Sequence, residues 1–261
     1  MALTSVRTLA VRAALDQVTD PELDESVVKL GFITDIKIVD DDKVHIDFRL
    51  PTYWCAANFS YLMAADMRDA VTALPWVHRV EVRLDEHMFV EAINAGIAAG
   101  QDFTEAFASE ASETLDSLRR HFGLKSFERR QDALLRHLLT QDHQAVALVA
   151  MSLAALRGLA LSDDGATLRA RYLARRGLVG GGELAFVTSQ DEPIMAETLG
   201  VYLRHIHRIG LNAEFNAALC SGLLAARYGA APGIGAESAE PELIDFIRAA
   251  RKAPGAPQPV L

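Results

Sequence analysis

The chain has 261 residues, of which 50% are hydrophobic and 23% are charged. This composition is typical of folded globular proteins and excludes an intrinsically disordered chain. Acidic residues outnumber basic ones by 35 to 26, for a formal net charge of -9, so we expect no nucleic-acid partner.

No segment predicts a secretory signal or a membrane span. The opening residues lack the long apolar core and the small-residue cleavage site of a signal peptide. The most apolar stretch, residues 145–156, has about 12 residues where a spanning helix needs roughly 20, and Arg157 closes it. We therefore expect a cytoplasmic protein with no membrane partner.

The first third of the chain begins with a helix, a turn and a hairpin. Apolar residues recur at helical spacing over residues 6–18, and Asp20-Pro21 ends this helix because proline disfavours a helical residue before it. A second short helix is expected at residues 23–29, ended by Gly31. Partly alternating β-branched residues over 33–48, around an acidic turn, then predict two paired strands.

A helix and a third strand complete this region. Asn58 is the expected N-cap of a helix that Pro75 ends. Residues 78–84 alternate Val80, Val82 and Leu84 toward one face, which predicts a strand.

From about residue 86 onward the pattern is helical. Apolar side chains step by three or four over residues 103–122 and again over 127–139, and residues 145–161 are apolar nearly all round, which predicts an enclosed central helix. The arginines at 169, 171, 175 and 176 are typical of a solvated face.

Glycines and a proline mark the last predicted elements. The glycine cluster at 177–182 lacks the residues of a phosphate loop and is interpreted as a flexible connection. A helical pair is expected over 194–209 and 213–228, with a hinge at Gly210, a cap at Asn212 and an end at Gly229. Pro241 is expected to open a last short helix.

Together these elements predict an α+β fold. We expect a small N-terminal α/β domain with a short mixed sheet at residues 1–88. An all-α helical domain should follow at residues 89–252, and then a mobile tail at 253–261.

Three segments of the first domain occur in the order found in one known family. They are VTDPELDESVVKLGFITDIKI at 18–38, VHIDFRLPTYWCAANF around Cys55, and LPWVHRVEVRL at 74–84. Residues 5–88 therefore resemble the iron-sulfur cluster assembly family of SufT-like and PaaD-like proteins, also described as domain of unknown function 59. The resemblance does not extend to the C-terminal region.

The resemblance implies the residues of a functional site. Cys55 would be the metal ligand, and it would hold a transient iron-sulfur cluster or iron and not a permanent cofactor. Asp20 and Glu22 resemble the acidic turn of the family and would act as oxygen ligands or orienting groups. The alternative for these two carboxylates is turn formation and helix capping.

The position of Cys55 supports thiol chemistry. Cys55 stands between a strand end and a helix start, where the helix dipole favours a thiolate. The alternative is that Cys55 is a small buried hydrophobic residue. One thiolate cannot hold a cluster that takes about four ligands, so a second copy of this chain in a homodimer, a client or a small thiol would supply the rest. The second cysteine, Cys220, falls in the other predicted domain, so a disulfide framework is not expected.

These observations predict a metallocentre maturation factor. It would assist assembly or delivery of an iron-sulfur cluster or iron to a client apo-metalloenzyme, and the PaaD-like resemblance suggests a bacterial oxygenase as that client. The alternative is a regulatory or scaffold subunit of a multicomponent enzyme complex. We expect no enzyme activity, because the spacing yields no catalytic set of residues.

Overall fold

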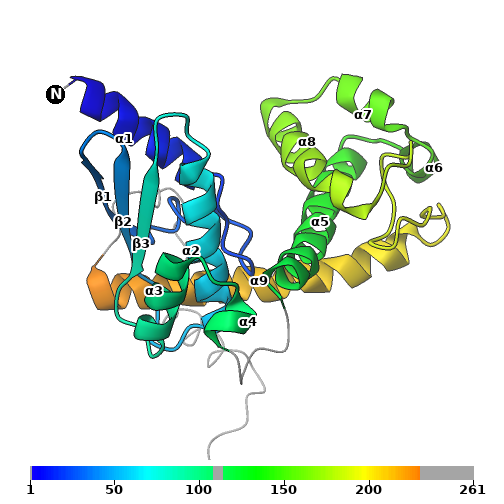
Figure 1. The fold of residues 1–261 in the computed structure, drawn as a ribbon. Coiled ribbons are helices and arrows are strands. Elements are labelled where there is room, and N and C mark those ends of the chain that lie inside the picture. The colour runs from blue at the N-terminus through cyan, green and yellow to red at the C-terminus, as the bar shows by residue number, and fades with distance from the viewer. Residues whose placement is uncertain (1, 108–113, 230–261) are drawn as a thin grey trace, which may run out of the picture.

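The computed structural model describes residues 2–107 and 114–229, which form two lobes (Figure 1). The sheet lobe, residues 2–107, contains the strands and the first four helices, and the helical lobe spans residues 124–206. Each lobe has its own apolar core, and two long helices, α5 (Leu115–Thr140) and α9 (Leu199–Tyr228), supply side chains to both cores. The predicted α+β fold is confirmed.

The sheet is small and mixed, as predicted. Its strands are β1 (Ile33–Val39), β2 (Lys43–Phe48) and β3 (Arg79–Leu84), in the order β1-β2-β3. β1 and β2 are antiparallel, and β2 and β3 are parallel. A parallel pair needs a crossover connection, and the helix α2 (Ala57–Thr72) provides it.

Local chemistry explains the hairpin. Asp40 and Asp41 have φ of 51° and 64°, a left-handed conformation that short polar side chains tolerate. Lys43 closes the turn with a 2.8 Å ion pair to Asp40. Gly31, with φ of 71°, makes the preceding bend that leads the chain into β1.

Helices cover one face of the sheet. The alternating residues Val44, Ile46 and Phe48 of β2 are completely buried. α1 (Ala2–Leu15) contacts β1, α2 contacts β3, and the two helices contact each other. α3 (Val90–Ala99) and α4 (Phe103–Ala106) extend the same core. The loop before α2 therefore lies at the edge of this packed core.

Two boundary predictions in the sheet lobe are corrected. Residues 23–29 form turns and not a helix, because Asp24 has φ of 54°. α2 begins at Ala57 with Ala56 at its N-cap, and the Asn58 side chain accepts from the Phe59 N–H and does not cap the helix.

The predicted apolar stripe at 103–122 does not lie on one helix. α4 ends at Ala106 and α5 begins at Leu115. Phe103, Phe107 and Leu118 nevertheless all enter the core of the sheet lobe. Ala111, counted in the same stripe, lies outside the described residues.

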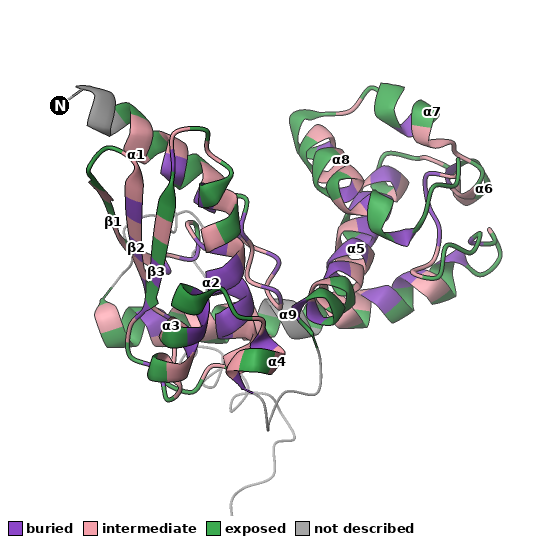
Figure 2. Cartoon of the chain, viewed as in Figure 1, coloured by how far each residue is buried: buried purple, intermediate pink, exposed green. Residues whose placement is uncertain are grey.

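The enclosed helix predicted at 145–161 is wrong. The segment forms two short helices, α6 (Ala145–Val149) and α7 (Leu153–Gly158), and their surfaces are largely exposed (Figure 2). The helix breaks because the backbone pairs instead with residues 183–185: the Leu153 N–H donates to the Glu183 carbonyl at 2.7 Å, and the Ala185 N–H donates to the Met151 carbonyl at 2.8 Å. The central helix of this lobe is α5.

The predicted solvated arginine face is wrong for Arg176, although Arg171 on the same helix is exposed. α8 (Asp163–Arg176) ends in Arg176, which is 2% exposed and donates to the carbonyls of Gly180, Leu184 and Ala185. The residues after the 3₁₀ turn Gly177–Val179 therefore fold around a buried guanidinium. The charge is accepted there because backbone oxygens satisfy its donors.

The predicted helical pair is one continuous helix. α9 runs through Gly210 without a hinge, so residue 212 lies inside it and is no cap, whereas the predicted end at Gly229 is confirmed by its φ of 80°. Leu203 and Ile206 anchor one half in the helical lobe and Leu224 anchors the other half in the sheet lobe, which outweighs the cost of about 1 kcal/mol for an interior glycine. Pro241 and the tail at 253–261 lie outside the described residues.

By length and composition alone, α9 could cross a membrane, and it is the one helix in the described ranges for which this holds. In this structure it runs beneath both lobes, as Figure 1 shows. His207 of α9 pairs with Asp132 of α5 at 3.0 Å, and Arg227 pairs with Glu86 of the sheet lobe at 2.8 Å.

Candidate functional site

Cys55 lies in the loop that joins β2 to α2. It is half-buried and packs against the core of the sheet lobe. Its sulfur lies 3.1 Å from Oγ1 of Thr52. Beside it, Tyr53 is 49% exposed and Trp54 is 72% exposed, so the loop presents aromatic surface next to a thiol.

His87 holds this loop in place from the other side. His87 is 2% exposed, and its Nε2 lies 2.8 Å from the Cys55 carbonyl oxygen. The Phe89 N–H donates to Nδ1 at 3.1 Å, so the proton of the neutral ring is on Nε2 and donates to Cys55. Burial lowers the pKa of His87, although the Cys55 carbonyl acts in the opposite direction. His87 therefore fixes the backbone of the cysteine as a neutral donor.

The sequence did not reveal the role of His87. It follows the third strand at a position where no local pattern distinguishes it from a surface histidine. A second contact supports the same pairing of loops, because the Met88 N–H donates to the Tyr53 carbonyl at 2.9 Å.

Asp20 forms the acidic turn. Its Oδ1 accepts from the N–H groups of Glu22 and Leu23 at 2.9 and 2.8 Å, which is the turn-forming alternative of the sequence analysis. Burial raises the pKa of Asp20, and the backbone donors only partly offset this. Its second oxygen, Oδ2, is not used in these two bonds.

Glu22 is tied to both long helices. Its Oε1 accepts from Nδ2 of Asn216 on α9 at 2.9 Å, and its carbonyl accepts from Arg129 on α5. Arg129 is also close enough for its charge to act on Asp20.

α9 brings the second cysteine to the same region. Burial raises the pKa of the Cys220 thiol to about 11, and the negative charges of Asp20, Cys55 and Glu22 add to the increase. Both cysteines are free. Cys220 lies on α9, which supplies side chains to the cores of both lobes.

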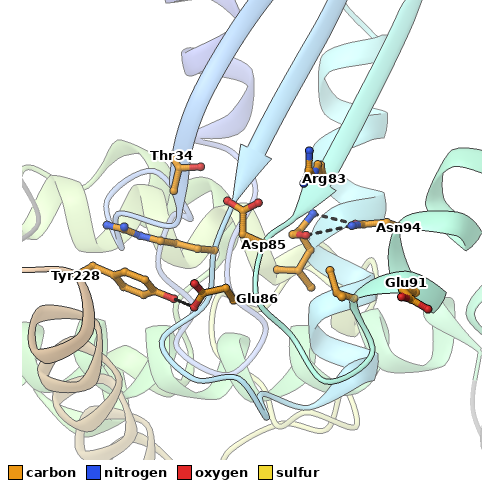
Figure 3. A pocket seen from close by; sticks show the side chains of 10 residues that line it. Thr34, Arg83, Asp85, Glu86, Glu91, Asn94 and Tyr228 are labelled. Carbon is orange, nitrogen blue, oxygen red and sulfur yellow. Dashed lines mark hydrogen bonds between the residues drawn. The ribbon is translucent and has the colours of Figure 1, made fainter.

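The end of α9 is docked beside the cysteine loop. Arg227 donates to the Pro51 carbonyl at 3.2 Å, and the Tyr228 hydroxyl lies 3.3 Å from Glu86 (Figure 3). The Arg49 guanidinium stacks 3.9 Å from the centroid of the Tyr228 ring. Pro51 and Glu86 belong to the two loops that hold Cys55, so α9 contacts both.

Asp24 is a second residue that sequence reasoning missed. It is 5% exposed and accepts two 2.7 Å bonds from Arg130 of α5. Burial opposes its charged form, but the hydrogen bonds and the positive charge of Arg130 outweigh this and lower the pKa of Asp24. The acidic turn is thereby locked to the helical lobe.

No group of three histidine, cysteine or acidic side chains in residues 2–107 and 114–229 is arranged to hold a metal ion. Cys55, Asp20 and Glu22 therefore do not form a complete coordination sphere by themselves. What the arrangement offers is a half-buried cysteine in a loop whose backbone is held by a buried histidine. Such a site can bind a thiophilic ion only with ligands that come from outside it.

The fold and the site define a small α+β domain that presents a thiol from the loop before a helix. Residues 9–83 match the model of the family described as iron-sulfur cluster assembly protein. An uncharacterized protein of Methanocaldococcus jannaschii is 35% identical over 83 residues, covering 31% of this chain and 83% of that protein. The Fe-S protein maturation auxiliary factor YitW of Bacillus subtilis is 31% identical over 74 residues, covering 28% of this chain and 71% of YitW.

A crystal structure of a domain of unknown function from Bacillus anthracis aligns with 32% of this chain and 78% of its own, at 21% identity and a TM-score of 0.30. The chain belongs to the iron-sulfur cluster assembly protein family through its sheet lobe. The matched residues lie within the range 5–88 where the sequence resembles that family, so the resemblance is confirmed. The match does not include the helical lobe.

Proposed function

We propose that this chain is a non-catalytic maturation factor that carries iron or an iron-sulfur intermediate on Cys55 and transfers it to a client apo-metalloenzyme. Membership of the iron-sulfur cluster assembly family supports this, as does the similarity to YitW, an Fe-S protein maturation auxiliary factor. The single structural observation behind it is the half-buried thiol of Cys55 in a loop positioned by His87.

Transient carriage follows from the incomplete site. One thiolate supplies a minority of the roughly four ligands that an iron-sulfur cluster takes, so the cargo must share its ligands with another group. Ligand exchange is then the route of release, since a client thiolate can replace a labile ligand. The exposed Tyr53 and Trp54 beside Cys55 form an apt contact surface for that client, because aromatic side chains dominate binding energy at interfaces.

We assign recognition of the client to the helical lobe, with an oxygenase of bacterial type as the client and the cytoplasm as the site of action. The helical lobe lies outside the residues that match the family, so it is an addition to the carrier domain. Such an added lobe is suited to recognising one particular client. The ion pair of Asp24 with Arg130 keeps the two lobes in fixed relation, so a client bound to one lobe would be held near Cys55.

The test is client activation by variants of the thiol. Cys55→Ser removes the soft ligand with a minimal change in volume, and we expect it to abolish activation of the client while the circular dichroism spectrum stays unchanged. Thr52→Val is the matched control in the same loop, since it removes the hydroxyl beside the sulfur and keeps the thiol. Full activation by Cys55→Ser would remove the thiol from the mechanism, and co-purification with an enzyme complex in fixed ratio would then favour a scaffold subunit.

A further inference from the structure

A cavity of about 370 Å³ lies where the acidic turn meets three helices. One wall is α5, which contributes Arg129, Ala133 and Arg136; these residues share one face of the helix because they are spaced by four and three positions. The acidic turn, α8 and α9 supply the other walls. Among the described residues, the lining does not include the loop that carries Cys55, so this cavity is a separate feature of the molecule.

The charged lining of the cavity is mainly basic. Four arginines line it together with one histidine, namely Arg129, Arg130, Arg136, Arg171 and His207. The acidic residues of the lining are Asp24 and Asp132. With the histidine neutral, four positive and two negative charges leave an excess of two positive charges inside one small cavity.

Both carboxylates of the cavity are already paired. The two oxygens of Asp24 each accept a 2.7 Å hydrogen bond from Arg130. Oδ1 of Asp132 accepts from Arg136 at 2.7 Å, and its Oδ2 lies 3.0 Å from Nδ1 of His207. Every carboxylate oxygen of the lining therefore has a partner, and two of the four arginines receive none of them.

Those two arginines contact backbone oxygens instead. Arg129 donates to the Glu22 carbonyl, and Arg171 donates to the Asp24 carbonyl at 3.4 Å. Nη2 of Arg129 is buried and has no hydrogen-bond partner among the described residues. Burial lowers the pKa of Arg129, and the carboxylates of the acidic turn only partly offset this. A cation in this position is stabilised when an anion comes close to it.

We propose that this cavity binds the phosphate group of a small molecule, with Arg136 and Arg171 as its contacts and Arg129 as a buried supporting charge. A phosphate monoester carries about two negative charges near pH 7, which equals the charge excess of the lining. The planar guanidinium also matches the geometry of phosphate oxygens. The volume is within the range of about 300–1,000 Å³ for small-molecule sites, and Leu23 and Leu168 offer apolar surface to an organic group.

Gly210 keeps the α9 side of the cavity open. It lines the cavity, and a Cβ at this position would have one described atom within contact range, Cγ of Arg129 at 4.0 Å. A larger side chain would therefore enter the space available to a ligand. This explains the glycine in the middle of α9, where the helix continues without a hinge.

The test is isothermal titration calorimetry of the full chain at constant ionic strength, with glycerol 3-phosphate, inorganic phosphate and succinate as separate probes. We expect one phosphate-bearing probe to bind per chain. Tighter binding of glycerol 3-phosphate would assign the site to organic phosphates, and tighter binding of inorganic phosphate would assign it to the free ion. Succinate carries two charges on separate carboxylates and should bind at least about tenfold more weakly.

Two variants locate the site. Arg171→Gln should weaken binding of the phosphate probe by about tenfold or more, whereas Arg157→Gln, the same loss of charge at an exposed arginine outside the cavity, should not change it. Gly210→Leu should abolish binding without lowering the thermal unfolding midpoint, because leucine favours a helix interior over glycine.

The outcome does not depend on the proposed function, since Cys55→Ser should bind the probe as the unaltered chain does. Failure of the unaltered chain to bind either phosphate probe would overturn the inference. Equal affinity for succinate would overturn the assignment to phosphate. Unchanged affinity in both Arg171→Gln and Gly210→Leu would show that phosphate binds elsewhere and would also overturn it.

Discussion

Replacement of His87 by alanine should loosen the loop that carries Cys55. The side chain is 2% exposed, and its two ring nitrogens satisfy the Cys55 carbonyl at 2.8 Å and the Phe89 N–H at 3.1 Å. His87→Ala leaves both backbone groups without these partners, at about 1–3 kcal/mol for each buried group. We expect the free energy of unfolding to fall by about 3 kcal/mol.

Local opening of the loop supplies a second measurement. If the loop opens to hydrate the Cys55 carbonyl, the loss in global stability becomes smaller and the thiol becomes more accessible. We expect the rate at which a thiol reagent modifies Cys55 to rise by about tenfold for each 1.4 kcal/mol by which the free energy of opening the loop decreases. The rate is best measured with Cys220→Ala present, so that one thiol is observed.

The pKa of His87 makes the same contact sensitive to pH. Burial lowers the pKa of His87 below its ordinary value of 6.5, so the unfolded chain binds a proton that the folded chain excludes. The stability that depends on neutral His87 is complete above pH 6.5 and is lost as the pH falls from 6.5 toward the folded pKa. This component should be absent from His87→Ala.

His78 provides the matched control. Its side chain is 77% exposed, so His78→Ala should change the free energy of unfolding by less than about 0.5 kcal/mol. Urea denaturation at pH 8 and pH 5.5 compares the three proteins. Equal stability and equal thiol reactivity in His87→Ala and the unaltered chain would refute the role given to His87.

Three further predictions concern side-chain contacts between the two lobes and within the helical lobe. Asp24→Asn breaks a buried bidentate pair with Arg130 and should lower stability by about 3–5 kcal/mol in urea denaturation. Because the pKa of Asp24 is lowered, its contribution is present above pH 3.8 and is lost as the pH falls through the folded pKa. Tyr172→Phe removes the hydroxyl that bonds Gln131 at 2.9 Å and should cost about 1–3 kcal/mol by thermal unfolding. Arg227→Ala releases one anchor of α9 and should increase the alkylation rate of Cys220 with little change in global stability.

Each of these three has a result that would contradict it. A loss of stability in Asp24→Asn no larger than that of the control Asp116→Asn would contradict the first, since the Asp116 side chain is 93% exposed. Tyr172→Phe with unchanged stability would mean that its hydrogen bonds contribute no net free energy. An unchanged alkylation rate in Arg227→Ala would mean that α9 does not depend on that contact for its docking.

Much of the sheet lobe could be predicted because its signals are local. The alternation of Val44, Ile46 and Phe48 identifies a strand with one buried face, and Pro75 and Gly229 end helices by their own backbone chemistry. The predictions failed where a distant segment competed for the same backbone. Residues 145–161 are apolar enough for one helix, but their pairing with residues 183–185 divides it.

The candidate site was half predictable for the same reason. Cys55 could be found from its position between a strand and a helix, and from family resemblance. Its partners could not be found, because the hydrogen bond from His87 spans 32 positions and the bond from Asn216 to Glu22 spans 194. No local pattern encodes a contact over such separations.

The three strands, the turn at Asp20 and the loop with Cys55 were determined by the sequence alone, since each depends on side chains within a few positions of one another. The continuity of α9 and its contact with the acidic turn through Asn216 and Glu22 were decided by the tertiary structure. The physical reason is that α9 joins both cores at once. Leu203 and Leu224 are buried in different cores, and this fixes the position and rotation of the helix between them. Their burial exists only after both lobes have formed.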